Sequence, residues 1–247
     1  MATEKIFIYG KHAVTEALTT TPHAVEKVFF TAQANEEAIQ KLAQKAGIVI
    51  EAFSDAVMAN VDKGVVHQGV AAQITLEKLM REYREFRETL EPTPETALVI
   101  LGEIQDPQNV GAIIRSAAAF GIAGVLIPEH NQAQITGSVV KVSAGMAFRI
   151  PLVTVVNVNT AVRDLKERGF WIYGLDETGP NPLPKETFDA PAVFILGNEA
   201  TGLREKTREL CDILLSIPMN PTCESLNVAA SGAVTLYAWS AQHPPVK

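Results

Sequence analysis

Cysteine is scarce in this chain of 247 residues, which contains only Cys211 and Cys223. Two cysteines do not make a disulfide framework, and no histidine stands at metal-ligand spacing from them. Long apolar stretches are missing as well, because runs such as Ala97–Leu101 and Ala192–Leu196 fall far short of the roughly 20 residues that cross a bilayer. Residues 1–9 lack the basic start and long apolar core of a secretory signal. These absences predict a reduced, soluble, cytoplasmic protein with no metal and no membrane span.

Three common catalytic fingerprints are absent. No G-x-G-x-x-G follows a predicted strand, no G-x-x-x-x-G-K-[ST] is present, and no G-x-S-x-G elbow occurs. The sequence therefore argues against a nicotinamide-dependent oxidoreductase, a P-loop NTPase and an α/β-hydrolase.

Basic stretches are absent too, since 21 lysine and arginine residues face 28 aspartate and glutamate residues, for a net charge of −7. This balance argues against a nucleic-acid binder that works by bulk positive charge. Net charge governs solubility and long-range steering, however, and not what a local patch can bind. If RNA is the substrate, a small cluster of arginine and lysine on an acidic body must meet its phosphates.

Hydrophobic residues make up 47% of the chain and charged residues 20%, the composition of a folded globular protein. The first 74 residues alternate between short apolar segments and amphipathic ones. We expect strands at 6–9, 27–31, 48–53 and 66–74, and helices at 11–18, 35–46 and 54–61. This pattern predicts a compact α/β module.

Residues 75–96 form a charged connector after that module. Apolar side chains recur at helical spacing from Leu76 to Leu90, and Pro92 and Pro94 then break any helix. We interpret the segment as a partly helical linker between two domains. The alternative is a surface helix of the second domain.

The remaining chain again alternates between strands and helices. We expect strands at 97–101, 125–128, 171–175, 192–196 and 213–217, helices at 110–120, 160–168, 203–210 and 225–239, and irregular structure up to residue 149. The unbroken apolar runs are typical of buried parallel strands. The alternation predicts an α/β fold with a parallel sheet that is covered on both faces.

Polar residues follow one of these strands at 102–115. Asn109 falls at a helix start, where its side chain can cap free backbone N–H groups, and Arg115 projects from the same face one to two turns on. Ligands in open α/β sheets gather at the carboxyl ends of strands, which is where this block lies. Taken alone, the block is equally well an ordinary capped helix with an exposed arginine.

Two further blocks follow strands nearer the C-terminus. Residues 197–203 place two glycines around Glu199, which suggests backbone brought close to a ligand. Residues 217–219 read Ile-Pro-Met, and Ser225 or Asn227 can cap the final helix. Each block alone is equally well a turn or a cap, whereas the three together point to one pocket.

The three blocks resemble the SpoU (TrmH-like) branch of the SPOUT RNA methyltransferases in order and spacing, over residues 97–240. The matching residues are Asn109-x-Gly111-x-x-x-Arg115, Gly197-Asn198-Glu199-x-x-Gly202-Leu203, Ile217-Pro218-Met219 and Ser225-Leu226-Asn227-Val228. Residues 141–145 also look like a family segment. The N-terminal module, through residues 9–18 and 66–70, is similar to the ribosomal-protein-like substrate-binding domain of the RlmB group.

The resemblance implies an S-adenosylmethionine-dependent 2′-O-methyltransferase that acts on RNA. It implies a C-terminal parallel-sheet SPOUT domain with a deep trefoil knot, and a small N-terminal α/β domain that binds the substrate. We place the N-terminal domain at 1–74, the linker at 75–96 and the methyltransferase domain at 97–247. Family members are homodimers, so Arg115 would act on a site that the other subunit completes.

The same resemblance assigns the cofactor to Gly197, Ile217 and Leu226, whose main-chain groups and apolar side chains would hold the adenine. The chain departs from the family at two nearby positions. Ala200 and Pro221 stand where glycine is usual, which bears on loop conformation and on the fit of the substrate.

Five residues are expected to carry the chemistry. A guanidinium stays charged in proteins, so we expect Arg115 to bind the phosphate beside the target ribose and lower the pKa of the hydroxyl, in place of the usual proposal that it is the base. Asn109 would hold Arg115 or the substrate. Glu199, Ser225 and Asn227 would orient the ribose and the arginine.

The N-terminal module favours an enzyme that modifies a guanosine of large-subunit (23S) rRNA, with Lys11, His12, His67 and Gln68 as candidate RNA contacts. The alternatives are a tRNA 2′-O-methyltransferase, a resistance-type enzyme acting on a ribosomal adenosine, and a non-catalytic RNA-binding or ribosome-assembly protein on the same fold. Binding of S-adenosylmethionine separates the last of these from the enzymes.

Overall fold

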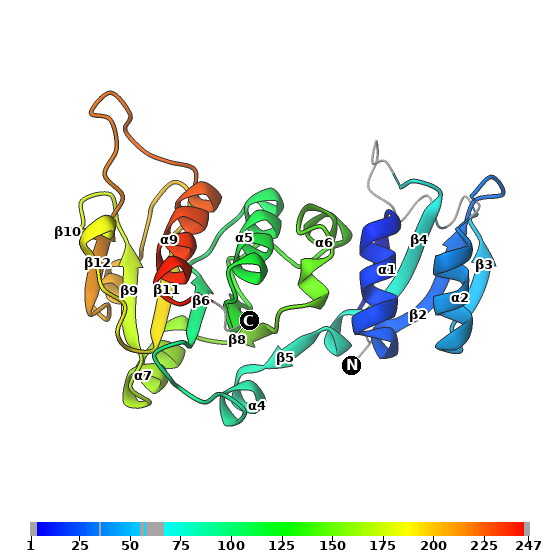
Figure 1. The fold of residues 1–247 in the computed structure, drawn as a ribbon, viewed down its shortest axis with the longest axis horizontal. Coiled ribbons are helices and arrows are strands. Elements are labelled where there is room, and N and C mark those ends of the chain that lie inside the picture. The colour runs from blue at the N-terminus through cyan, green and yellow to red at the C-terminus, as the bar shows by residue number, and fades with distance from the viewer. Residues whose placement is uncertain (1–3, 35, 55–56, 58–66, 245–247) are drawn as a thin grey trace.

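The computed structural model describes residues 4–34, 36–54, 57 and 67–244. Two β-sheets organise this part of the chain, one in each half (Figure 1). The helix expected at 54–61 falls almost entirely outside the described residues, of which only Val57 belongs to it.

The N-terminal sheet has the strand order β1-β4-β2-β3. Its elements are β1 (Lys5–Tyr9), α1 (Lys11–Thr20), η1 (Pro22–Ala24), β2 (Val25–Phe30), α2 (Glu37–Lys45), β3 (Val49–Ala52) and β4 (Val70–Thr75). Strand β4 is antiparallel to β1 and β2, and β3 is parallel to β2. The helices α1 and α2 pack on one face, where Ile8, Val28 and Ile74 are fully buried.

The second sheet has eight described strands in the order β10-β12-β9-β11-β6-β7-β8-β5, and every neighbouring pair is parallel. The strands are β5 (Met80–Glu82), β6 (Ala97–Leu101), β7 (Gly124–Pro128), β8 (Leu152–Val155), β9 (Trp171–Leu175), β10 (Asn181–Pro182), β11 (Ala192–Leu196) and β12 (Ile213–Ser216). The predicted parallel sheet is confirmed.

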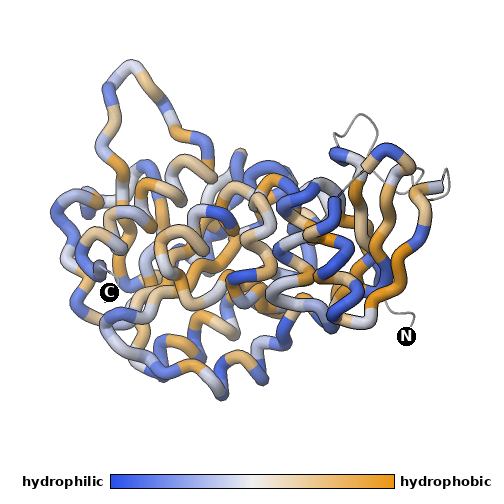
Figure 2. The backbone as a smooth tube through the Cα atoms, turned by 45° about the vertical axis from the view of Figure 1, so that its right-hand side comes forward, coloured by the Kyte–Doolittle hydropathy of each residue, from blue (hydrophilic) through white to orange (hydrophobic). Residues whose placement is uncertain are grey.

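Helices cover both faces of this sheet, as the unbroken apolar strands require. The residues Ala97, Val99 and Leu101 face α5 (Pro107–Ala119), α6 (Gly137–Val142) and α9 (Val228–Gln242). The alternate residues Leu98 and Ile100 face α4 (Tyr83–Glu88) and α7 (Val158–Glu167). Figure 2 shows the apolar residues concentrated inside these layers, and short elements complete the chain: η2 (Leu76–Lys78), η3 (Met146–Phe148), η4 (Leu183–Lys185) and α8 (Glu205–Arg208).

The segment between the two sheets differs from the expected partly helical linker. It forms η2, then strand β5, then the short helix α4, and β5 pairs with β8 at the edge of the large sheet. Backbone hydrogen bonds to β8 outweigh the helical spacing of the side chains at Met80–Glu82. Helix α6 also lies within a stretch that the sequence left irregular, and β8 follows that stretch without having been anticipated.

The two halves pack against each other through α6 and the segment that follows it. A Cβ atom placed on Gly137 would lie 1.9 Å from the carbonyl oxygen of Phe7, so β1 approaches α6 too closely for any side chain there. The guanidinium of Arg149 donates two hydrogen bonds to the carboxylate of Glu16, at 2.6 and 3.2 Å. One hydrophobic core therefore runs from α1 through α6 to α5.

Candidate functional site

A cavity of about 650 Å³ opens outside the carboxyl ends of β9, β11 and β12. Six of the residues singled out in the sequence line it: Gly197, Glu199, Ile217, Ser225, Leu226 and Asn227. The second and third blocks therefore meet in one place. The loop from β12 to α9, which carries Ser225, Leu226 and Asn227, projects beyond the body of the molecule (Figure 1).

The charged residues that line this cavity are acidic. Asp176, Glu177 and Glu199 line it, and no lysine, arginine or histidine is among its lining residues in the described part of the chain. Asp176 is paired with Arg208, which lies outside the lining, so Glu177 and Glu199 carry the unpaired negative charge. Such walls disfavour ligands with several phosphates, such as dinucleotides. They suit a ligand with a net positive charge and an adenosyl group, because S-adenosylmethionine carries a sulfonium and an ammonium against one carboxylate.

Close backbone packing shapes the floor of the cavity. The backbone N–H of Gly102, just after β6, donates to the carbonyl of Leu196 at the end of β11, with 2.6 Å between the nitrogen and the oxygen. A Cβ atom on Gly197 would lie 2.4 Å from the backbone of Gly202, so only glycine fits. Strand order reverses between β6 and β11, which is the place where ligands bind in open parallel sheets.

A hydrogen-bonded chain of three side chains joins the three blocks. The amide nitrogen of Asn109 donates to Glu199 Oε1 at 3.0 Å, and the amide nitrogen of Asn227 donates to Asn109 Oδ1 at 2.9 Å. Asn227 Oδ1 in turn accepts from the N–H groups of Ala229 and Ala230 and caps α9. The side chain of Asn109 thus fixes Glu199 relative to the start of the last helix.

The surroundings of Glu199 keep its carboxylate ionised. Burial raises its pKa, but the hydrogen bond from Asn109 and the backbone N–H groups around it, including those of Gln105 and Asp106, together lower the pKa below the usual glutamate value. A carboxylate with a lowered pKa is a poor proton acceptor. Glu199 is therefore suited to holding the loop after β6 and to electrostatic attraction, and not to general-base catalysis.

Asn109 has a different place from the one its position in the sequence suggested. Asp106 caps α5, since its side chain accepts from the N–H of Gln108 and Pro107 occupies the first turn. Asn109 is the third residue of α5, within its first turn, and is only 7% exposed. The prediction that Asn109 caps the helix is wrong, and the buried amide instead bonds to Glu199 and Asn227.

Arg115 lies outside the cavity of its own chain. Arg115 is exposed, whereas Asn109 is buried. The step of six residues from one to the other turns an α-helix by about 600°, about 120° short of two full turns, so the two side chains point about 120° apart around the helix axis. Arg115 therefore does not share the face of Asn109, contrary to expectation. Within the described residues it has no hydrogen bond or ion pair, so Asn109 does not hold it.

Three residues that build the site were given no role from the sequence: Asp176, Glu177 and Asn198. Asp176 and Glu177 directly follow β9, and polar residues after a predicted strand are the signal that could have found them. Asn198 also anchors the site, since its Nδ2 donates to the carbonyl of Glu103 at 2.8 Å. At Ala200, φ is not positive, unlike at four other non-glycine residues of the described chain, so alanine carries no backbone strain there.

Comparison with known families decides the class of this site. The model of the SpoU rRNA Methylase family matches residues 96–237, and that of the RNA 2′-O ribose methyltransferase substrate-binding domain matches residues 7–80. The chain belongs to the SpoU rRNA methylase family. The predicted family is confirmed, and with it the methyltransferase class.

Curated relatives of this SpoU-family protein match over nearly its whole length. The 23S rRNA (guanosine-2′-O-)-methyltransferase RlmB of Nitrosomonas europaea is 33% identical over 98% of this chain and 93% of its own. The RlmB of Xanthomonas axonopodis pv. citri is 37% identical over 96% of each chain.

Solved structures share the fold. The SpoU methyltransferase AviRb from Streptomyces viridochromogenes, in complex with AdoMet, superposes with a TM-score of 0.82 at 22% identity, over 97% of this chain and 90% of its own. An AdoMet-bound rRNA methyltransferase from Sinorhizobium meliloti gives 0.81 at 20% identity, over 98% and 88%. These likenesses confirm the expected SPOUT-type fold of this SpoU-family chain.

No three histidine, cysteine, aspartate or glutamate side chains in the described part of this SpoU-family chain gather closely enough to hold a metal ion. None of its described helices has the length and apolar character to cross a membrane.

Proposed function

We propose that this protein transfers a methyl group from S-adenosylmethionine to the 2′-hydroxyl of a guanosine in 23S rRNA. The observation that carries the proposal is the acidic cavity at the strand ends, built from the second and third blocks and tied to the first by Asn109. The names of the relatives support the choice of nucleoside and RNA.

The cofactor supplies an electrophilic methyl group on a sulfonium. Leu226 and Ile217 would exclude water from the adenine, and the backbone beside Gly197 would bind its polar edge. Glu177 and Glu199 would favour the positively charged cofactor over its neutral-sulfur product. Ser225 and Asn227, at the mouth of the cavity, would orient the target ribose.

Arg115 would bind the phosphate beside the target ribose and lower the pKa of the attacking hydroxyl. Because it lies outside the cavity of its own chain, a second copy of the protein must bring it to the site. Helix α9, which packs against α5, presents Val234 and Tyr237 to solvent with 42% and 61% exposed. The ring of Tyr237 contacts Phe120 at the end of α5, with 5.8 Å between centroids. This apolar surface would be covered in a homodimer.

The N-terminal domain, with proposed limits 1–74, would select the RNA. The backbone N–H of Lys11 donates to Gln68 Oε1 at 3.0 Å, and the ring of His67 stacks on Phe53 with 5.0 Å between centroids. The residues proposed as RNA contacts thus meet at one end of the sheet, with His12 beside Lys11. The linker 75–96 joins this domain to the methyltransferase domain, 97–247.

Small residues at the start of α9 support the trefoil knot that the family implies. A Cβ atom on Gly232 would lie 2.9 Å from the side chain of Leu196, so α9 lies directly against the end of β11.

A substrate in ribosomal RNA also favours the cytoplasm as the site of action.

The test is methyl transfer from tritiated S-adenosylmethionine to total RNA of a strain that lacks the protein, followed by mapping of the modified ribose. We expect label at one guanosine of 23S rRNA. Arg115→Ala should reduce the rate at least 100-fold while cofactor binding stays within twofold, since Arg115 does not line the cavity. Arg163→Ala, an exposed arginine on α7, serves as the control. Wild-type rates for Arg115→Ala contradict the assigned role, label in tRNA contradicts the substrate, and a protein that binds no cofactor contradicts the activity.

A further inference from the structure

A second cavity, of about 220 Å³, opens at the same edge of the large sheet. It lies outside the ends of β6, β7 and β8, on the other side of the point where the strand order reverses. Leu203 lines both cavities, so the two cavities are adjacent. The residues assigned above to the cofactor and to catalysis do not line this second cavity.

The lining of the second cavity differs in chemistry from that of the first. His130, Asn131 and Asn159 contribute an imidazole and two amides, and Arg204 contributes a guanidinium. Val156 stands among them with 73% of its surface exposed. The cavity therefore offers neutral donors and acceptors, apolar contacts from residues such as Val156, Ile195 and Leu203, and one cation, which is paired with Glu103.

Two lining residues are held in unusual backbone conformations. Glu103 has φ of 64° and Asn131 has φ of 54°, in the left-handed region that non-glycine residues rarely adopt. Contacts to neighbouring loops hold both conformations: Glu103 accepts from Arg204 Nε at 2.8 Å, and the carbonyl of Asn131 accepts from Gln105 at 3.1 Å. Such strain concentrates where a protein must present groups in a fixed geometry.

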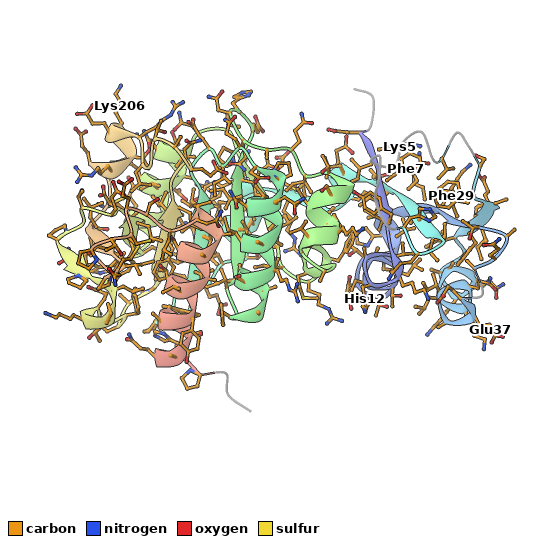
Figure 3. The ribbon with its side chains drawn as sticks, turned by 90° about the horizontal axis from the view of Figure 1, so that it is seen from above. Lys5, Phe7, His12, Phe29, Glu37 and Lys206 are labelled. Atoms are coloured by element: carbon orange, nitrogen blue, oxygen red, sulfur yellow. The ribbon has the colours of Figure 1, made fainter. Side chains whose placement is uncertain are left out.

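Polar groups in this cavity are left without partners. Asn159 Oδ1 accepts from the hydroxyl of Thr207 at 2.8 Å, while its amide N–H groups have no partner among the described residues. Within the same part of the chain, the ring of His130 has none either. The side chain of Arg204 is 64% exposed although it pairs with Glu103. Lys206, on helix α8, projects outward from the molecule (Figure 3).

We propose that this second cavity binds a nucleobase of the RNA, next to the nucleotide that is methylated. Side-chain amides match the donor and acceptor pattern on the edge of an unpaired base, and an imidazole and an exposed valine suit its flat face. Arg204, at the rim, would contact the adjoining phosphate. Sequence-specific recognition of RNA relies on unstacked bases in single-stranded loops, which a pocket of this size accepts one at a time.

The inference rests on the proposed function, because it assigns a part of the RNA to a second subsite. Catalysis uses the first cavity, and the second would determine how the RNA is positioned. Loss of the subsite should therefore raise the KM for RNA and leave the affinity for the cofactor unchanged. This separation makes the inference testable apart from the chemistry.

Two variants probe the subsite in different ways. Val156→Trp fills the cavity from an exposed position, and His130→Ala removes a polar group without adding bulk. With a 23S rRNA fragment as substrate, we expect the KM to rise about tenfold for Val156→Trp and several-fold for His130→Ala, with the Kd for S-adenosylmethionine within twofold of wild type. Glu167→Trp and Glu167→Ala are matched controls, at an exposed site at the C-terminal end of α7 that lines neither cavity.

A binding measurement that does not use activity completes the test. With S-adenosylhomocysteine saturating the first cavity, GMP, AMP, CMP and UMP are titrated onto the protein by saturation-transfer NMR. We expect at least one to bind to the wild type and to Glu167→Trp, and none to bind to Val156→Trp. Wild-type KM in both subsite variants, or nucleotide binding that Val156→Trp leaves intact, overturns the proposal. A protein that binds nucleotide in this way but transfers no methyl group contradicts the proposed function alone.

Discussion

Asn109 shows how a single side chain connects distant parts of the sequence. Its amide both donates and accepts, so it bridges the Glu199 carboxylate and the Asn227 amide. An aspartate there would set two carboxylates against each other, and a leucine would leave both neighbours without a partner. The requirement for asparagine therefore comes from two contacts about 90 and 118 residues away in sequence, which local pattern does not reveal.

The lowered pKa of Glu199 predicts a pH-dependent contribution to stability. Its folded-state pKa lies below the usual glutamate value of 4.5, so the ionised form stabilises the fold fully above that pH and loses this effect as the pH falls through the folded pKa. Hydrogen bonds to a charged group contribute about 1.5–3 kcal/mol, but solvent screens Glu199 because it is exposed. We therefore expect Glu199→Gln to lower the free energy of unfolding by about 1 kcal/mol at pH 7. Denaturant unfolding between pH 3 and 7 checks this. The difference between the variant and the wild type should shrink toward pH 3, and a difference independent of pH contradicts the assignment.

At the scale of secondary-structure elements, the sequence predicted the helices and strands whose structure depends mainly on their own residues and not on distant partners. The strands 97–101, 171–175 and 192–196 have the predicted limits, because short, mainly apolar runs are typical of buried parallel strands. Strand β5 was missed because its three residues include two charges and its hydrogen bonds go to β8, some 70 residues later. Six cavity residues were found because they lie in loops between a strand and a helix, whereas Asp176 and Glu177 were missed although they directly follow β9. The place of Arg115 depends on how α5 is rotated about its axis.

Helix α6 provides a test of how the two halves pack. Gly137→Ala places a methyl group where the carbonyl of Phe7 lies, so α6 and β1 must separate. Overpacking of this kind costs about 1–3 kcal/mol, and the loss of contact should loosen the N-terminal domain. We expect a lower melting temperature, faster proteolysis near residues 67–80 and a raised KM for RNA, with cofactor affinity unchanged. Ser138→Ala, the adjacent residue, is the control, and equal melting temperatures for the two variants contradict the close contact.

At the scale of the whole molecule, the proposed dimer predicts that activity depends on the exposed face of α9. Tyr237→Arg puts a charge into an apolar surface that a second copy would bury, so we expect monomers in analytical ultracentrifugation and a methylation rate at least tenfold lower. Because the acidic cavity belongs to a single chain, the monomer should still bind S-adenosylmethionine, which separates loss of the partner from misfolding. Trp171→Arg is the matched control, since Trp171 is an aromatic residue with 47% exposure on a strand of the sheet and not on α9. A monomeric wild type with full activity is incompatible with a site shared between subunits.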